Sequence, residues 1–534
     1  MCAAPVSLRK ILSEFPFPYQ PPNIPDIAIL GITLDSRAVK PGYLFVAEKG
    51  AALDGHAFIP NAIRNGAVVV AGEKDVPGLP VPYIRLQDSR AALTWLSAAF
   101  HGWPGRKLTI IGVTGTDGKT TTTNLIHQIL RAAGIRAGMV STVNAVIGNE
   151  VLDTGFHVTT PDAHDLQRYL AQMVDAGLTH AVLETTSHGW AQHRVDASEF
   201  DIGVVTNITH EHLDQHGTYE NYRAAKARLF ASLERTLPKP QGNPRLAVLN
   251  RDDCSFEYLD HVTHVNKLSY GLQPDADLRA EEIQQESGGT VFTVVHRGFR
   301  VGVKMQLAGV FNISNCLAAL GATVIGLGIE PAVAAAGIAS MEGVPGRMER
   351  IDIGQEFTAI VDFAHTPNAL RVALETARTM LGADFPGEAG RVIAVFGSAG
   401  LRDKEKRRMM AETSTGLADL TVLTAEDPRT ESLDAILAEM AEGATMARGR
   451  EGETFWRVPD RGEAIRFAVR LARPGDIVLA CGKGHEQSMC FGKLEYSWDD
   501  RTAMRAALSE VAGKDGPAMP YLPTQDRGEA EWLH

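Results

Sequence analysis

Short apolar runs alternate with helix-like segments through the middle of the chain. The β-branched run from Leu108 to Val113 ends in a glycine-rich turn, and Asn124 to Ala133 follows as a candidate helix. Two further apolar runs, Ala181 to Leu183 and Ile202 to Val205, also stand between helix-like segments. This alternation predicts a parallel sheet covered by helices.

The N-terminal region has the same mixed pattern on a smaller scale. Its apolar runs are Ile27 to Leu30, which Gly31 is expected to close, and Ala67 to Ala71. Between them, Phe58 to Asn65 predicts a helix in which Pro60 is tolerated only in the first turn. We therefore expect a small α/β domain here.

Proline and glycine suggest where the domains meet. Trp103-Pro104-Gly105 and the segment Gly343 to Arg347 interrupt regular structure and are the candidate boundaries. Beyond the second boundary the predicted strands are Thr358 to Val361, Val392 to Phe396, Leu420 to Thr424 and Asp476 to Ala480. The pattern thus predicts α/β domains over 1–105, 106–345 and 346–534, the last with an irregular tail from Gly513.

Composition narrows the class of protein. The chain has 534 residues, too many for one hydrophobic core, and its net charge of −12 comes without any long basic run, which argues against nucleic acid as a partner. The five cysteines are scattered without a CxxC pair, so neither a disulfide framework nor a structural zinc site is expected. No signal-peptide core and no run of about 18 apolar residues occurs. We expect a cytoplasmic protein without a membrane span.

The strongest chemical signal is the segment from Gly112 to Thr120, which reads Gly-Val-Thr-Gly-Thr-Asp-Gly-Lys-Thr between a strand and a helix. Glycines allow a backbone to wrap around phosphate oxygens, and N–H groups at a helix N-terminus point toward that charge. Lys119 would neutralise the β- and γ-phosphates, and the Thr120 hydroxyl would reach Mg²⁺. The spacing departs from the common P-loop because Val113 stands where its first glycine is usual.

An acidic residue and a histidine-rich segment follow later strands. Glu184 ends an apolar run, so its carboxylate is expected at the carboxyl edge of the sheet, where it could bind Mg²⁺ or serve as an ordinary helix cap. His210, His212 and His216 lie close together in the sequence, but no cysteine or HExxH pattern supports a zinc site. One histidine assisting Mg²⁺ at a nucleotide site fits better.

Taken in order, these motifs resemble the Mur ligases of peptidoglycan synthesis, and within them the UDP-N-acetylmuramoyl-tripeptide synthetases. The likeness runs from Leu34-Asp35-Ser36-Arg37 to Gly482-Lys483-Gly484-His485-Glu486. It implies a three-domain α/β architecture: an N-terminal domain for the uridine nucleotide, a central P-loop ATPase domain and a C-terminal Rossmann-like domain for the incoming amino acid.

The resemblance also implies the reaction. ATP, a co-substrate used with Mg²⁺, would phosphorylate the D-Glu carboxylate of UDP-MurNAc-L-Ala-D-Glu, and the amine of a diamino acid would attack the acyl phosphate. Charge on the transferring phosphoryl group would be spread over Mg²⁺ and Lys119. We expect the enzyme to act as a monomer.

Site residues carry over position by position. The resemblance gives catalytic roles to Lys119, Glu184, His212 and Lys226, with Thr120, Glu184 and His212 at the metal and Lys226 carbamylated. ATP would contact Gly115, Thr116, Asp117, Gly118, Lys119, Thr120, Thr121, Asn315, Arg347, Asp362 and His365. The UDP-MurNAc-dipeptide would contact Ser36, Thr159, Thr160, Thr186, Gln192 and Arg194. Position 186 is commonly serine in the family, and Phe363 replaces a common tyrosine.

The resemblance places selection of the third amino acid in the C-terminal domain, at Arg402, Glu426, Asp427, Arg429, Gly482 and Glu486. Enzymes of the family that use meso-diaminopimelate typically have Asp-Asn-Pro-Arg where this chain has Glu426-Asp427-Pro428-Arg429. The retained Arg429 suits a distal carboxylate. The extra acid suits the terminal ammonium of L-lysine or L-ornithine. These two cues conflict, and meso-diaminopimelate is slightly favoured.

Two other classes of function stay open from the sequence. A folylpolyglutamate-type or other ligase with the same ATPase core would not need Ser36 and Thr159-Thr160. A catalytically silent ATP-binding relative would be expected to have lost Lys119, Glu184, His212 or Lys226, and all four are present.

Overall fold

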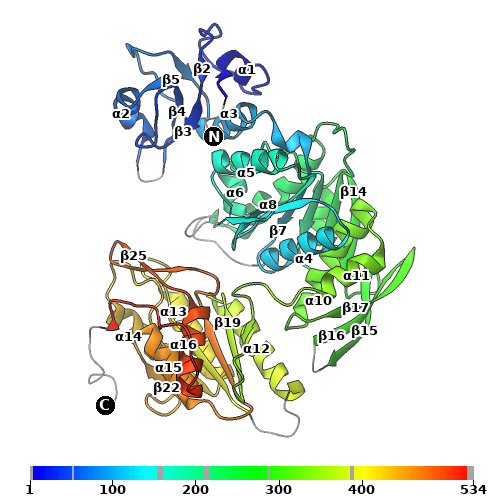
Figure 1. The fold of residues 1–534 in the computed structure, drawn as a ribbon, viewed down its shortest axis with the longest axis vertical. Helices are drawn as coiled ribbons and strands as arrows, with labels where there is room; N and C mark the ends of the chain where they lie inside the picture. Colours follow the sequence, from blue (N-terminus) through cyan, green and yellow to red (C-terminus); the bar gives the residue numbers. More distant parts are fainter. Residues whose placement is uncertain are drawn as a thin grey trace. The chain divides into compact units, whose positions relative to one another are not determined.

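The structure is a computed structural model that describes residues 4–50, 53–152, 160–209, 216–286, 289–384 and 390–525. It divides into two compact units, and the division passes through the end of the largest sheet. The first unit holds the N-terminal sheet and most of the central sheet, and the second holds the C-terminal sheet (Figure 1). Each unit is described by itself.

The N-terminal sheet is parallel and has the strand order β3-β4-β5-β6. Its strands are β3 (Gly31–Thr33), β4 (Tyr43–Ala47), β5 (Ala67–Gly72) and β6 (Tyr83–Arg85). A separate two-stranded ladder joins β1 (Val6–Ser7) to β2 (Ala28–Ile29), and the helices are α1 (Leu8–Leu12), α2 (Ile59–Arg64) and α3 (Ser89–Phe100). Apolar side chains are buried on both faces of the sheet. The predicted helix is confirmed, with Pro60 in its first turn.

The expectation that Gly31 closes a strand is wrong. Gly31 opens β3, and the Tyr43 ring packs so closely on it that a Cβ would lie 2.5 Å from the ring. The glycine is therefore required by a side chain on the neighbouring strand rather than by a turn.

The central sheet has the order β10-β9-β8-β11-β7-β12-β13-β14-β15-β16-β17. Neighbours from β8 to β15 pair in parallel, and β9 and β10 add an antiparallel edge. The strands are β7 (Thr109–Thr114), β8 (Ala137–Val140), β9 (Ala145–Ile147), β10 (Glu150–Leu152), β11 (His180–Glu184), β12 (Ile202–Val205), β13 (Leu246–Asn250), β14 (Asn266–Gly271), β15 (Leu278–Glu286), β16 (Gly289–His296) and β17 (Phe299–Met305). The helices are α4 (Lys119–Ala132), α5 (Ala163–Asp175), α6 (Ser187–Ala191), α8 (Tyr219–Leu233), α9 (Phe256–Val262), α10 (Phe311–Leu320) and α11 (Pro331–Ala339).

The C-terminal sheet has the order β18-β19-β23-β20-β21-β22, parallel except for the edge strand β18. Its strands are β18 (Glu349–Ile351), β19 (Thr358–Asp362), β20 (Val392–Phe396), β21 (Leu420–Leu423), β22 (Phe455–Arg457) and β23 (Ile477–Cys481). The helices are α12 (Pro367–Asp384), α13 (Glu405–Leu417), α14 (Leu433–Met446), α15 (Arg461–Leu471) and α16 (Asp500–Ala512), and β24 (Ser488–Phe491) pairs with β25 (Leu494–Ser497) in a hairpin. The predicted α/β class is confirmed in both units.

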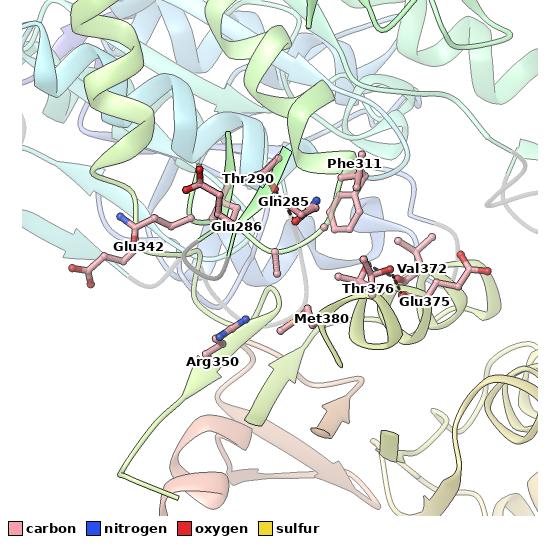
Figure 2. A pocket seen from close by; sticks show the side chains of 17 residues that line it. Gln285, Glu286, Thr290, Phe311, Glu342, Arg350, Val372, Glu375, Thr376 and Met380 are labelled. Carbon is pink, nitrogen blue, oxygen red and sulfur yellow. Dashed lines mark hydrogen bonds between the residues drawn. The ribbon is translucent and has the colours of Figure 1, made fainter. Parts of the chain in front are cut away.

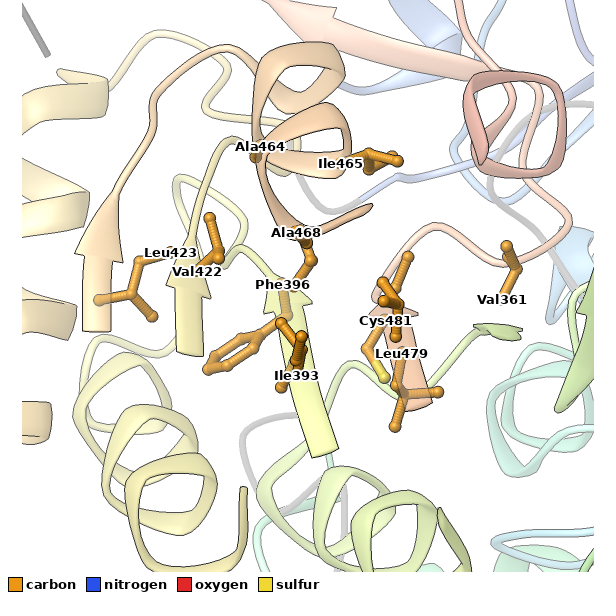
Figure 3. Close-up of a cluster of buried hydrophobic side chains, with 14 of the residues drawn as sticks. Val361, Ile393, Phe396, Val422, Leu423, Ala464, Ile465, Ala468, Leu479 and Cys481 are labelled. Atoms are coloured by element: carbon orange, nitrogen blue, oxygen red, sulfur yellow. The ribbon is translucent and has the colours of Figure 1, made fainter. Parts of the chain in front are cut away.

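The core of the second unit lies between this sheet and its helices. Figure 3 shows Ala464 and Ala468 of α15 above strand residues such as Phe396 and Leu479, and all four side chains are buried. Small residues on α15 let the helix approach the strands closely, which matters below because the same helix begins at Arg461. The tail from Lys514 to Gln525 contains no helix or long strand, but Leu522 packs into this core.

Candidate functional site

The phosphate loop follows β7 and opens α4. Gly118 is the N-cap of α4 with φ +79°, and a Cβ there would collide with the Asn315 side chain. Only glycine avoids both the left-handed strain and the collision. Lys119 Nζ donates to the Thr116 carbonyl at 2.6 Å, so the lysine lies over its own loop. Because α4 points its N-terminal N–H groups toward this loop, the geometry suits a bound anion.

A second segment holds the loop in shape from behind. The Thr116 N–H donates to the Asn207 carbonyl at 2.7 Å, and Thr206 Oγ1 donates to the Asp117 carbonyl at 2.6 Å. Thr116 Oγ1 lies 3.0 Å from the Tyr222 hydroxyl on α8. The loop is therefore fixed by β12 and α8 as well as by its own glycines.

Glu184 ends β11, the strand beside β7, and is 2% exposed. Its Oε1 accepts from Thr120 Oγ1 at 3.1 Å and from Thr142 Oγ1 at 2.8 Å, and its Oε2 accepts from the Thr142 N–H at 2.8 Å. The carboxylate and the Thr120 hydroxyl, both predicted metal ligands, thus lie together beside the phosphate loop. Hard oxygen donors in this place fit Mg²⁺. His212, the third predicted ligand, lies outside the described residues.

Lys226 is buried, with 2% exposure, on α8. Its Nζ donates to the Gly115 carbonyl and stands 4.5 Å from the centre of the Tyr222 ring. A buried lysine directed at the phosphate loop differs from the solvated helix residue that its sequence alone would suggest. Asn315 on α10 is also close, since its Oδ1 accepts from Thr122 Oγ1 at 3.3 Å, and Thr121 of α4 is buried as well.

The residues expected to hold the muramoyl peptide form a second group near β11. Thr160 Oγ1 lies 3.1 Å from Thr186 Oγ1, and the Arg194 guanidinium donates to the Thr160 carbonyl at 2.7 Å. Thr186 also caps α6 through the Gly189 N–H, and the Gln192 amide lies one turn further on, 2.6 Å from the His188 ring. Thr159 lies outside the described residues.

Ser36 does not join this group through any contact in the described residues. Its partners are amides of the N-terminal domain: Asn61 donates to Ser36 Oγ at 3.3 Å, and Asn65 donates to the Ser36 carbonyl at 2.8 Å.

The second unit brings together Arg347, Asp362 and His365. The Arg347 guanidinium lies 4.5 Å from the centre of the Phe363 ring, which also contacts the rings of His365 and His485 at 4.5 and 4.9 Å. Burial lowers the pKa of His365 and of His485 to about 3, so both rings are neutral at neutral pH. Burial raises the pKa of Asp362, and the nearby Arg347 opposes that rise.

Four predicted amino-acid-binding residues converge at the carboxyl edge of the same sheet. Gly482, with φ +113°, lies so close to the Glu426 carboxylate that a Cβ there would collide with it. Asp427 Oδ1 accepts from Lys483 Nζ at 3.1 Å and from the Cys490 N–H at 2.9 Å, and Lys483 pairs with Glu486 at 2.5 Å. Lys483 was not predicted, although it stands inside a motif that carried the resemblance.

Glu426 and the two predicted arginines differ in their surroundings. Glu426 Oε2 is buried without a hydrogen-bond partner among the described residues, and burial raises the pKa of Glu426 to about 7. Arg429 is partly exposed and makes one long hydrogen bond of 3.3 Å from its guanidinium to the Gly400 carbonyl. Arg402 is exposed.

The second unit also contains a cavity of about 450 Å³ (Figure 2). Thr290 and Phe311 line one part of it, and Val372 and Thr376 of α12 line another. None of the predicted site residues lines this cavity, so it is not the site of the predicted chemistry.

The phosphate loop, the Thr120–Glu184 pair and the parallel sheets define an enzyme of the nucleoside-triphosphate-binding α/β class. Three matches to known families cover most of the chain: "Mur ligase family, catalytic domain" over residues 28–101, "Mur ligase middle domain" over 113–323 and "Mur ligase, glutamate ligase domain" over 346–484. The chain belongs to the Mur ligase family.

Relatives and a solved structure agree with that assignment. The UDP-N-acetylmuramyl-tripeptide synthetase of Roseiflexus sp. (strain RS-1) is 44% identical, with 94% of this chain and 99% of the relative covered. A UDP-N-acetylmuramoyl-L-alanyl-D-glutamate–2,6-diaminopimelate ligase of Geobacillus thermodenitrificans is 40% identical over 95% of this chain and 100% of the relative. A solved structure of a ligase with that same name matches with a TM-score of 0.64 and 30% identity, covering 95% of this chain and 99% of that one. Within the described part of the chain, none of the helices is long and apolar enough to cross a membrane.

Proposed function

We propose that the protein is an ATP-dependent ligase that adds a diamino acid to UDP-MurNAc-L-Ala-D-Glu in peptidoglycan precursor synthesis. The observation that carries this proposal is the convergence of Lys119, the Thr120–Glu184 pair and buried Lys226 at one phosphate loop. The names of the similar proteins support the substrate. We further propose that the enzyme is a cytoplasmic monomer whose domains span 1–105, 106–345 and 346–534.

The proposed reaction has two steps. The D-Glu carboxylate attacks the γ-phosphorus of ATP, so that ADP leaves and an acyl phosphate forms. The amine of the diamino acid then attacks the acyl carbon, an amide bond forms, phosphate leaves and the amine loses a proton. Lys119 and the N–H groups of the loop would stabilise charge on the transferring phosphoryl group.

Mg²⁺ would be held by Thr120, Glu184 and His212, and it would neutralise phosphate charge when bound. Thr142 orients the Glu184 carboxylate for this purpose through two hydrogen bonds. We propose that Lys226 is carbamylated: its amine attacks CO₂ and releases a proton, which would turn a buried cation beside the loop into an anion suited to a metal.

The proposed contacts with ATP and with the muramoyl peptide involve the groups of residues described above. ATP would lie against residues 115–121, Asn315, Arg347, Asp362 and His365. The muramoyl peptide would lie against Ser36, Thr159, Thr160, Thr186, Gln192 and Arg194. The mutual contacts of Thr160, Thr186 and Arg194 support the second set because these residues form one hydrogen-bonded group.

For the incoming amino acid we propose meso-diaminopimelate. In the sequence, the acidic side chain of Asp427 disfavoured an incoming amino acid with a distal carboxylate. In the structure, Asp427 Oδ1 already accepts hydrogen bonds from the Lys483 ammonium and from the Cys490 N–H. Its charge is therefore partly compensated inside the protein, by an ammonium that it shares with Glu486. Arg429 makes only one long side-chain hydrogen bond among the described residues, which supports a role in binding a carboxylate.

L-lysine and L-ornithine are the second candidates because of Glu426. Its buried Oε2 has no partner among the described residues and would accept a hydrogen bond from a terminal ammonium. With its pKa near 7, however, Glu426 can also hold a proton and so tolerate a nearby carboxylate.

The test is phosphate release that depends on an amine. The purified enzyme would be supplied with ATP, Mg²⁺ and UDP-MurNAc-L-Ala-D-Glu, and meso-diaminopimelate, L-lysine and L-ornithine would be compared at equal concentration. We expect turnover with meso-diaminopimelate to exceed turnover with the other two. Lys119→Ala should abolish it and serves as the control for contaminating ATPases. Turnover with none of the three would overturn the proposed function.

A further inference from the structure

Arg461 is the first residue of α15 and one of the most deeply buried charged residues of the second unit. Its side chain is 0% exposed. Asp460 caps the helix in front of it, accepting from the Glu463 N–H at 2.9 Å. Ala464 and Ala468 of the same helix pack on the sheet (Figure 3). The Arg461 guanidinium reaches backbone carbonyls at the carboxyl ends of the strands.

The guanidinium is held on one side by a carboxylate. Arg461 Nε donates to Asp500 Oδ1 at 2.7 Å and its NH2 group donates to Asp500 Oδ2 at 2.6 Å. This bidentate ion pair fixes the plane of the guanidinium. Trp498 Nε1 donates to Asp500 Oδ1 at 2.8 Å. The ion pair thus anchors Arg461 to Asp500, the first residue of α16.

On the other side the same guanidinium binds two backbone carbonyls. Its NH1 group donates to the Ala425 carbonyl at 3.1 Å, and its NH2 group donates to the Cys481 carbonyl at 2.7 Å. These carbonyls directly precede Glu426 and Gly482. Arg461 therefore contacts the peptide bonds from which two of the proposed amino-acid-binding residues extend.

The strands that carry those carbonyls are not neighbours. Cys481 ends β23 and Ala425 follows β21, while β20 lies between the two strands. No sheet hydrogen bond can set the spacing of Glu426 and Gly482 directly, yet the Glu426 carboxylate lies against Gly482. Within the described residues, two side chains join these segments across β20 at this edge: Arg461, which binds both backbone carbonyls, and Lys483, whose Nζ donates to Asp427 Oδ1.

We propose that Arg461 is a positioning residue for the incoming amino acid: by joining the Ala425 and Cys481 carbonyls to Asp500, it sets the spacing of Glu426 and Gly482. The inference rests on the proposed function, in which these two residues bind the amino acid. It predicts that disturbing Arg461 weakens amino acid binding selectively. A purely structural ion pair would lower stability without that selectivity.

The second unit supplies a matched control. Arg391, 25% exposed, forms an ion pair with the buried Asp476, its Nε and NH2 groups donating to Asp476 Oδ2 at 3.1 and 2.6 Å. Arg391 precedes β20 and Asp476 precedes β23, so this pair lies at the amino edge of the sheet, whereas Arg461 contacts the carboxyl ends of β21 and β23. Arg391→Lys therefore disturbs an arginine–aspartate pair at the opposite edge of the same sheet.

The experiment compares Arg461→Lys with Arg391→Lys in steady-state phosphate release, with thermal unfolding of both measured by circular dichroism. A lysine keeps the charge but cannot hold Asp500 and both carbonyls in one plane. For Arg461→Lys we expect the KM of the amino acid to rise about tenfold or more, with the KM of ATP and of UDP-MurNAc-L-Ala-D-Glu changed less than about twofold. For Arg391→Lys we expect no selective change in the amino acid KM.

Trp498→Phe keeps the inference testable if Arg461→Lys does not fold. It removes only the Nε1 hydrogen bond to Asp500 and should raise the amino acid KM in the same selective way, by a smaller factor. An unchanged or unselective KM in whichever variant folds, with the wild type active, would overturn this inference alone. Absence of wild-type turnover with every amine would overturn the proposed function and this inference with it.

Discussion

At the scale of single residues, the orientation of Glu184 depends on a residue that the sequence did not single out. Thr142 donates to both carboxylate oxygens, one through its N–H and one through its hydroxyl. Groups that orient a metal ligand commonly affect metal affinity by about 10–100-fold when removed. Thr142 is therefore a positioning residue for the proposed Mg²⁺ site.

Thr142→Val should raise the Mg²⁺ concentration for half-maximal turnover by about tenfold. The change removes the hydroxyl donor to Glu184 Oε1 and leaves the backbone donor in place. Thr142→Ser, which keeps the hydroxyl, is the matched control and should resemble the wild type. Binding of Mn²⁺ measured by electron paramagnetic resonance provides a readout independent of turnover. Equal metal dependence in both variants would contradict the assigned role.

Glu426 predicts a pH dependence of stability. Burial raises its pKa to about 7 from 4.5, against the opposing charges of Lys406, Arg461 and Lys483. The folded protein therefore holds this proton more tightly than the unfolded chain does. The resulting stabilisation is fully present below about pH 4.5 and is lost as the pH rises through 7.

Glu426→Gln cannot lose this proton, so its stability should fall less than that of the wild type between pH 5 and 8. The difference between the two proteins should change by at most about 3 kcal/mol over this range. Thermal unfolding of both proteins at several pH values measures it. Parallel curves of melting temperature against pH would show that Glu426 does not titrate there.

The sequence allowed candidate site residues to be proposed only where a motif contained them. The phosphate loop is contiguous, so its glycines, Lys119 and Thr120 stand out in the sequence. Thr142 lies 42 residues from Glu184, and Arg461 lies 39 residues from Asp500, so only the fold brings each pair together. The burial of Lys226 is likewise a product of packing by α8, and nothing in its own segment predicts it without the family.

At the scale of elements, the strands were predicted well because buried parallel strands are continuous apolar runs. All five residues of β20 are buried, and the predicted run Val392 to Phe396 has the same bounds. The helix after the phosphate loop was predicted to begin at Asn124 but begins at Lys119. The helix begins with Lys-Thr-Thr-Thr-Thr. β-Branched polar residues have low helix propensity, so the pattern did not predict a helix here. The preceding strand and loop fix where the helix begins.

Gly118→Ala tests the junction between the loop and α4. The substitution would strain a residue at φ +79° and drive a Cβ into the Asn315 side chain. Gly134, at the other end of the same helix, has φ +71° with nothing within 4 Å of a Cβ, so Gly134→Ala imposes the strain without the collision. We expect Gly118→Ala to weaken binding of an ATP analogue by about tenfold or more, measured by calorimetry, and Gly134→Ala to leave it unchanged. Equal effects would assign the requirement to backbone strain alone.

At the scale of the whole molecule, the two compact units should differ in what stabilises them. The phosphate loop and Glu184 belong to the first unit, whereas Arg461, Glu426 and the C-terminal tail belong to the second. Most of the proposed ATP contacts lie in the first unit, so a bound nucleotide should stabilise that unit more than the second by mass action. Multidomain proteins commonly unfold in more than one transition, so the two units offer separate signals.

The tail provides the change that separates those signals. Leu522 is 0% exposed within the core of the second unit, and Thr524 Oγ1 donates to Asp460 Oδ2 at 2.6 Å, beside Arg461. Leu522→Ala should therefore lower the free energy of unfolding by about 2–5 kcal/mol, because it removes buried methyl groups from the core. The sequence alone did not predict that this core includes a residue of the irregular tail. Tyr521→Ala changes a half-exposed neighbour and should cost less than about 1 kcal/mol. Differential scanning calorimetry with and without an ATP analogue should show Leu522→Ala lowering the transition that the analogue raises less. If Leu522→Ala and the ATP analogue shift one and the same transition, the two units unfold together. The tail then contributes to the stability of the first unit as well as of the second.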